Sequence, residues 1–97
     1  MSAYIILVNF TDQGIRNAKE TVKRARAAEQ ALEAVGGRKI GIWWTMGQYD
    51  MVFIAEGPND EAAMRAILGV AMQGNVRTST LKAFSEEEME HIVAGLP

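Results

Sequence analysis

The chain of 97 residues contains no cysteine, which excludes disulfide bonds, thiolate nucleophiles and cysteine-bound metals. It also lacks a long hydrophobic run near its start. The apolar stretch at residues 5–8 is too short for a signal-peptide core or a membrane span, and no basic residue precedes it. We therefore expect a cytoplasmic protein that does not enter a membrane.

The chain also lacks a large excess of charge of either sign. Ten Lys and Arg against twelve Asp and Glu leave a formal charge of −2, which excludes broad attraction to nucleic acid or to an anionic membrane. Basic residues at 16, 19, 23 and 26 are typical of a solvated helix face. The single histidine, His91, lies among glutamates, where a surface ion pair is favoured over a metal or acid–base role. No motif indicates a metal or cofactor, so none is expected.

The length leaves room for one domain, residues 1–97, which can bury roughly 60 to 70% of its unfolded surface. Runs of β-branched and aromatic residues predict strands, and apolar residues spaced by three and four predict helices. A capping box at Ser85 and Glu88 predicts a last short helix. The expected strands are residues 4–10, 39–46, 50–56 and 76–84, and the expected helices are 15–35, 60–74 and the segment after Ser85.

This β-α-β-β-α-β order predicts a ferredoxin-like α+β fold with an antiparallel sheet in the order 4-1-3-2 and both long helices on one face. The two central strands are apolar on both sides, since Ile5 and Leu7 alternate with Ile6 and Val8. An antiparallel sheet with one face in water would alternate apolar with polar residues. We therefore expect the helix-free face to bind a second copy, in a dimer or higher oligomer, burying about 800 Å² per partner.

The segment from Trp43 to Asp50 predicts a β-hairpin with a polar, aromatic tip and Gly47 in its turn. The topology brings the tip to the same end of the sheet as the end of the first strand and the start of the fourth. A cation, a carboxylate and a phenol meeting there could orient a small polar or carboxylated molecule against a tryptophan. The candidate ligand-binding residues are Asn9, Trp43, Trp44, Tyr49, Asp50 and Arg77.

A structural interpretation stands beside this one, because the ends of turns collect polar residues in any protein. For Asp50 and Arg77, an internal ion pair or a turn-capping role is favoured over ligand binding. Tyr49 is compatible with packing of its ring. Trp43 and Trp44 point to opposite faces of their strand, so one fills the monomer core and the other an interface or a pocket.

The residues around this hairpin resemble the GYD family of small bacterial proteins, whose signature letters fall on Gly47, Tyr49 and Asp50. The resemblance extends to residues 4–15 and 74–80. It implies membership of the dimeric α/β-barrel superfamily, in which cofactor-independent monooxygenases, isomerases, haem enzymes and amino-acid-sensing domains occur. Shared fold does not determine which of these activities a member has.

Three hypotheses about function remain open. The first is a homo-oligomeric module that binds a small organic molecule, anionic or aromatic, near the hairpin. The second is a cofactor-independent monooxygenase-like or isomerase-like enzyme acting on small aromatic substrates. The third is an assembly subunit whose apolar sheet face is its whole function. A well-formed apolar cavity at the hairpin end would argue against the third.

Overall fold

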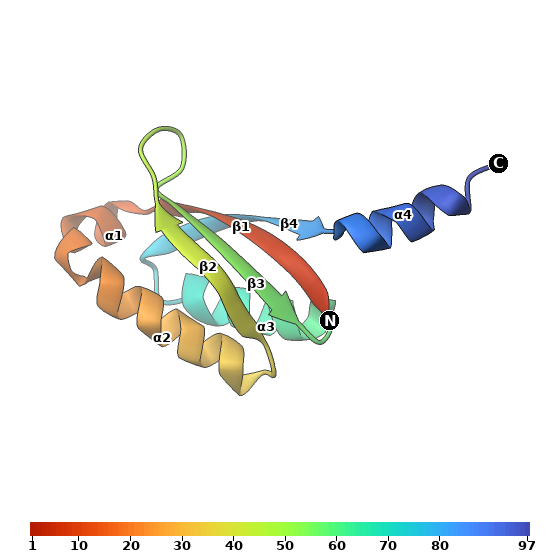
Figure 1. Ribbon diagram of the computed structural model, residues 1–97. Coiled ribbons are helices and arrows are strands. Elements are labelled where there is room, and N and C mark those ends of the chain that lie inside the picture. The colour runs from red at the N-terminus through yellow and green to blue at the C-terminus, as the bar shows by residue number, and fades with distance from the viewer.

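The computed structural model describes all 97 residues as one four-stranded antiparallel sheet with two long helices against one of its faces (Figure 1). Along the chain the elements are β1 (Ser2–Phe10), α1 (Asp12–Arg16), the 3₁₀ helix η1 (Ala18–Glu20), α2 (Thr21–Ala34), β2 (Arg38–Trp44), β3 (Met51–Gly57), α3 (Asp60–Ala71), β4 (Val76–Ala83) and α4 (Glu86–Ala94).

The strand order β2-β3-β1-β4 is the predicted order 4-1-3-2, so the ferredoxin-like α+β fold is confirmed. The central strand β1 pairs antiparallel with β3 on one side and β4 on the other. Val8 thereby lies opposite Met51 and Thr78. Because β1 runs antiparallel to both β3 and β4, the end of β1, the start of β3 and the start of β4 all meet at one end of the sheet.

The core lies between the sheet and the two long helices. Alternation along β1 and β3 sends Tyr4, Val8, Met51 and Phe53 toward the helices, and each is at least nine-tenths buried. Leu32 of α2 closes one of the two small clusters that these residues form. Only eleven of the 97 residues are buried, so much of the apolar content of this chain is on its surface.

The expected continuous helix over residues 15–35 is wrong at its amino end. The chain turns helical at Asp12, leaves the helix at Asn17 and resumes as α2 at Thr21. The guanidinium of Arg24 spans the break, donating to the Asn17 carbonyl at 2.8 Å and to the Gly14 carbonyl at 3.1 Å. These bonds reach from α2 back over the break and satisfy carbonyls at the end of α1.

The other boundaries shift by a few residues. β2 ends at Trp44 rather than 46, β3 extends to Gly57, and α3 ends at Ala71 because Gly74, with φ of 86°, leads the chain into β4. Asn59 caps the start of α3, since its side chain accepts from the Ala62 N–H at 2.9 Å. The predicted capping box of Ser85 and Glu88 is confirmed.

The last helix, α4, projects away from the sheet and from both long helices (Figure 1). It stretches the molecule to 52 × 30 × 18 Å and raises its radius of gyration to 14.6 Å. A compact chain of this length has a radius of gyration of about 12.5 Å. None of the helices is both long and apolar enough to cross a bilayer.

Candidate functional site

The hairpin loop between β2 and β3 rises above the end of the sheet (Figure 1). Asp50 ties this loop to β1. The Asp50 backbone N–H donates to the Val8 carbonyl at 2.9 Å, and its carboxylate accepts from the Phe10 N–H at 2.8 Å. The Asp50 carbonyl in turn accepts from the Thr45 N–H at 2.9 Å. Asp50 therefore positions the backbone, which supports the turn-capping interpretation, and no ion pair joins it to Arg77.

The rest of the loop is closed by local contacts. The Thr45 hydroxyl donates to the Tyr49 carbonyl at 2.7 Å, across the turn that contains Gly47. Gly47 has φ of 117°, as its expected turn role requires. Tyr49 is half-buried, and Met46 at the tip is fully exposed. The Gly, Tyr and Asp residues thus belong to one closed loop docked on the end of β1.

The two tryptophans lie on opposite faces of β2, as predicted. Trp44 is on the helix side, where its indole N–H donates to the Thr21 hydroxyl at 2.9 Å. Trp43 is on the helix-free side and is 56% exposed. Its indole lies above Gly41, where a Cβ would come within 2.5 Å of the ring. Trp43 is therefore the residue of the pair on the helix-free face, and Trp44, which is 41% exposed, does not fill the core as predicted.

Asn9 and Arg77 are paired in register on the helix-free face, at the hairpin end. Arg77 is exposed and forms no ion pair. The six candidate residues thus gather at or near one end of the sheet but not around one point. Asn9, Trp43 and Arg77 are on the helix-free face, Trp44 is on the helix face, and Tyr49 and Asp50 belong to the loop.

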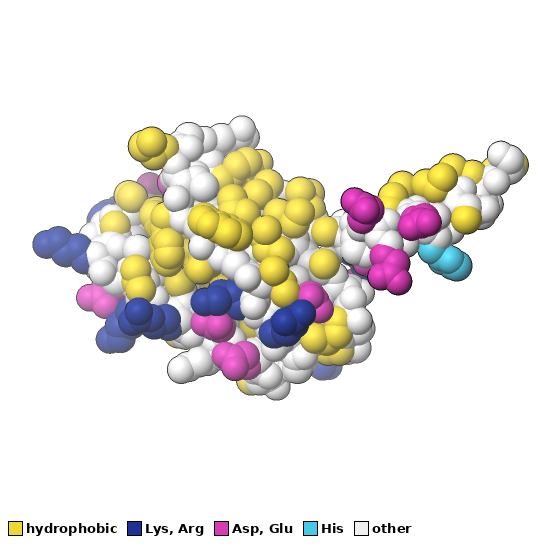
Figure 2. Space-filling view, viewed as in Figure 1, with side chains coloured by type: hydrophobic (Ala, Val, Ile, Leu, Met, Phe, Trp, Pro, Cys, Tyr) yellow, Lys and Arg dark blue, Asp and Glu magenta, His cyan; other side chains and the backbone are white.

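The helix-free face of the sheet is apolar over its two central strands, and on β4 it carries the polar Arg77 and Ser79 before the apolar Leu81. Ile5 and Leu7 on β1 lie beside Val52 and Ile54 on β3 in the pairing register. These four side chains are half-buried by one another, while Trp43 and Leu81 at the edge strands are about half exposed. Figure 2 shows hydrophobic side chains gathered over the strands, with charged groups around them. We call this surface the open sheet face, defined by Ile5, Leu7, Trp43, Val52, Ile54 and Leu81.

An apolar pocket of about 100 Å³ lies on the opposite side, between the sheet and the long helices. Phe10, whose N–H bonds to Asp50, and Thr21, which bonds to Trp44, both line it. Arg24 is the one charged residue in its wall, with its guanidinium carbon 5.8 Å from the centroid of the Phe10 ring. The pocket is smaller than the cavities of roughly 300–1,000 Å³ that hold most small-molecule ligands.

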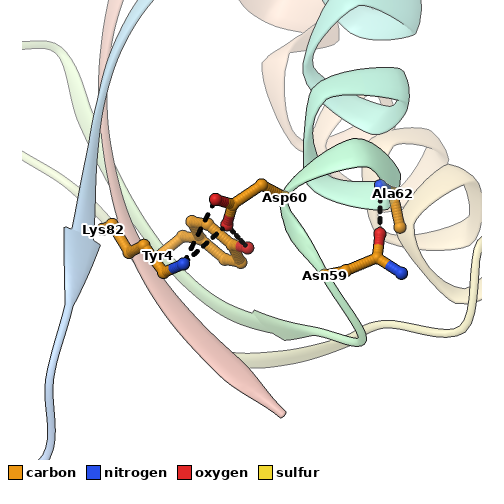
Figure 3. Close-up of polar contacts among 5 residues, drawn as sticks. All are labelled: Tyr4, Asn59, Asp60, Ala62 and Lys82. Atoms are coloured by element: carbon orange, nitrogen blue, oxygen red, sulfur yellow. Dashed lines mark hydrogen bonds and ion pairs between the residues drawn. The ribbon is translucent and has the colours of Figure 1, made fainter.

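A shallow groove of about 360 Å³ runs between α3 and β4, and a polar cluster closes one end of it (Figure 3). The Tyr4 hydroxyl donates to Asp60 at 2.5 Å, and the Lys82 ammonium lies 3.0 Å from the same carboxylate. Burial and then the bond to Asp60 raise the pKa of Tyr4. The bond from Tyr4 and then that from Lys82 lower the pKa of Asp60, and Asp60 raises the pKa of Lys82. Each group is held in its ordinary protonation state, so the cluster is a latch between the sheet and the start of α3.

The outer face of α3 carries an apolar stripe that the sequence interpretation missed. Met64, Leu68 and Met72 are spaced by four residues and are 54%, 54% and 83% exposed. On the inward side of α3, Ala62 and Ala63 are buried. Apolar residues at positions that an amphipathic helix would leave polar were the available signal. We call these three residues the α3 stripe.

Known proteins resemble this chain along most of its length. A family model described as the GYD domain matches residues 4–93. A protein of Thermus thermophilus, named glutamine synthetase and cystathionine beta-lyase binding protein, is 32% identical over 84 residues. The match covers 86% of this chain and 88% of that protein.

Two solved structures share the fold. The crystal structure of TTHA0845 from Thermus thermophilus aligns with a TM-score of 0.56 at 20% identity, covering 88% of this chain and 95% of that one. The crystal structure of FFRP-DM1 aligns with a TM-score of 0.59 at 19% identity, covering 87% of this chain and 100% of that one. At these identities the likeness concerns the fold alone.

Proposed function

The chain belongs to the GYD-domain family, and from that premise we propose that it is a homo-oligomeric protein-binding module whose copies associate through the open sheet face. The observation that carries the proposal is the run of apolar side chains on the helix-free face of the two central strands, with Trp43 and Leu81 half exposed on the edge strands. Contiguous apolar patches of this kind mark protein interaction sites. The name of the Thermus relative, which describes a protein that binds two enzymes, supports a role in binding proteins.

A single copy exposes the apolar side chains of this face to water, and association removes them from water. Burying apolar surface stabilises by roughly 25 cal/mol per Å². A two-fold contact uses each residue of the open sheet face twice, so a few hundred Å² per copy yields a stabilisation of several kcal/mol before the cost of association is subtracted. The helix face of the sheet offers no such gain, because α2 and α3 already cover it.

A pair of variants on β4 tests the contact. Leu81 is on the open sheet face and Thr80 is on the helix side, and both are exposed. Lysine is tolerated at either position in a single copy, but at 81 it places an ammonium in the interface. We expect Leu81→Lys to raise the dimer dissociation constant at least tenfold in sedimentation equilibrium.

The matched control is Thr80→Lys, which we expect to change that constant less than twofold. Equal effects of the two lysines would show that the open sheet face is not the contact. Circular dichroism and denaturant unfolding of both variants check that the domain remains folded.

The α3 stripe is our proposed surface for the partner protein, since it remains free when the open sheet face is occupied. Glutamine synthetase and cystathionine β-lyase, the enzymes in the name of the relative, are the partners to test first. In sedimentation velocity with each purified enzyme, we expect Leu68→Gln to weaken the complex at least fivefold. Glu33→Gln on the exposed side of α2 is the control, and equal loss in both variants would contradict the assignment.

Binding of a small organic molecule near the hairpin is the second candidate, and the apolar pocket favours it. Asp50 and Trp44 hold the pocket residues Phe10 and Thr21, so the hairpin borders the pocket. Its volume suits about one aromatic ring, because an engineered cavity of roughly 150 Å³ holds benzene.

Native mass spectrometry of the purified protein tests this candidate directly. We expect a co-purified molecule that is lost in Ala28→Leu, which fills the pocket from α2. A metabolite screen should then show a ligand that stabilises the wild type and no longer stabilises Ala28→Leu. Identical spectra for both proteins, with no ligand in the screen, would exclude this candidate and leave the protein-binding proposal intact.

A further inference from the structure

The helix α4 is well formed but projects away from the rest of its own chain (Figure 1). Ser85 and Glu88 build a complete capping box at its start, with bonds of 2.9 and 3.0 Å. Every residue from Phe84 to the C-terminus is exposed. Isolated helices shorter than about 12–15 residues are marginal in water, and α4 has nine. Its stability therefore requires a packing surface that the single copy does not provide.

The sequence of α4 is made for packing on one side. Met89, Ile92, Val93 and Leu96 follow the spacing of a single apolar face, and each is between 42% and 65% exposed. Glu87, His91 and Ala94 lie on the opposite side of the helix. An apolar stripe beside a polar one is the pattern of a helix that docks on another protein surface.

The distribution of charge along the chain indicates which surface α4 packs against. The four glutamates of α4 leave ten basic and eight acidic side chains on the remainder of the chain, so the body carries a formal charge of +2 and the helix −4. Six of the basic side chains, Arg77 among them, form no ion pair within their own copy. The helix and the body of a second copy are therefore electrostatically complementary.

The size of the open sheet face points the same way. Four strands of seven or more residues give a footprint of roughly 450 Å², from strand spacing and rise. A stable interface needs about 800 Å² per partner. Each α4 adds a footprint of about 130 Å², and in a two-fold pair each copy both gives and receives one. The helix also follows closely after Leu81 at the edge of the open sheet face, so the two surfaces are contiguous.

We infer that α4 is an arm that packs its apolar face against a second copy of this chain and completes the dimer interface. The inference rests on the proposed self-association and adds to it a reciprocal contact, in which the α4 of each copy packs against the other copy. In the dimer each copy contacts the other through the open sheet face and through the helix α4 that extends beyond the edge of that face.

Two double variants in the full chain test the arm. We expect Ile92→Gln/Val93→Gln to raise the dimer dissociation constant at least tenfold in sedimentation equilibrium. The matched control, His91→Gln/Ala94→Gln, places the same residues on the polar side of α4 and should change the constant less than twofold. An equal effect of the two double variants on the dissociation constant would overturn the inference that α4 contacts the second copy.

A photo-crosslinker in place of Leu96 gives a second readout that does not depend on the stability of α4. In an equal mixture of isotopically heavy and light chains, we expect crosslinked peptides that join heavy to light. Links only within one chain, or none, would overturn the inference. If Leu81→Lys dissociates the dimer while the arm variants do not, the arm fails and the proposed function stands. A wild-type protein that is a single copy overturns both.

Discussion

At the scale of single residues, Asp50 shows how a signature residue can serve the backbone. Its carboxylate accepts from the Phe10 N–H, and its own N–H reaches Val8, so one residue fixes the hairpin on the end of β1. Arg77, at the same end of the sheet, has no such contact and is exposed. The two residues that looked like an ion pair therefore have different roles in the fold.

This difference predicts unequal effects on stability. Asp50→Ala leaves the Phe10 N–H without its acceptor and should lower the free energy of unfolding by about 1–3 kcal/mol. Asp50→Asn keeps an acceptor oxygen and should cost less, while Arg77→Ala should stay within about 0.5 kcal/mol of wild type. Urea unfolding at one fixed protein concentration measures all three. Equal losses at positions 50 and 77 would contradict this assignment.

The latch of Tyr4, Asp60 and Lys82 predicts how stability depends on pH. The pKa of Asp60 is lowered in the folded state, so its contribution is present above its ordinary value and is lost as pH falls below about 4. The pKa values of Tyr4 and Lys82 are raised. Their contribution is present below about pH 10 and is lost as pH rises through those raised values.

Unfolding midpoints across the pH range check this expectation. Wild type should be flat between about pH 5 and 9 and should fall on both sides. Asp60→Asn removes the carboxylate that contributes to all three shifts, so its midpoint should be lower on the plateau and less dependent on pH on the acid side. On the alkaline side the pH dependence should weaken less, because burial is the main cause of the raised pKa of Tyr4. Parallel curves for the two proteins would show that the latch contributes nothing.

At the scale of elements, α1 is fixed by its contact with the loop before β4. The Thr11 N–H donates to the Asn75 carbonyl at 3.1 Å, and a Cβ on Gly14 would lie 1.9 Å from the same oxygen. Thr11 also caps α1 by accepting from the Gly14 N–H. The break between α1 and α2 thus follows from docking of α1 on the sheet end.

Two glycine substitutions separate this contact from helix propensity. Gly14→Ala should lower the free energy of unfolding by about 1–3 kcal/mol, because the backbone at Asn75 has to move. Gly69→Ala, in α3 with open space around it, should raise it by about 0.5–1 kcal/mol. Thermal and urea unfolding give both values, and a neutral Gly14→Ala would mean that α1 does not dock as described.

The same elements show how far sequence patterns reach. Strand runs and helix caps are local patterns, so the strands and the caps at Asn59 and Ser85 could be predicted. The order of these elements along the chain then predicted the strand order. The break at Asn17 depends on Arg24 and on a contact about sixty residues away, which periodicity does not contain. Likewise the position of the hairpin was predicted, but the bond from Phe10 to Asp50 depends on the shape of the loop. The candidate ligand site therefore stays a prediction.

At the scale of the whole molecule, this chain places much of its apolar content outside its core. Its exposed apolar surfaces are the open sheet face, the arm α4 that follows from the edge of that face, and the α3 stripe on the helix side of the domain. A single copy in water would expose all three. Pairing through the sheet and the arms buries two of them and leaves the α3 stripe for another protein.

The mass of the wild-type protein in solution tests this account most directly. Sedimentation equilibrium at micromolar concentration should give twice the 10.6 kDa of one chain. A mass of 10.6 kDa across the same range, with the protein folded, would contradict the proposal that the open sheet face is a contact between copies.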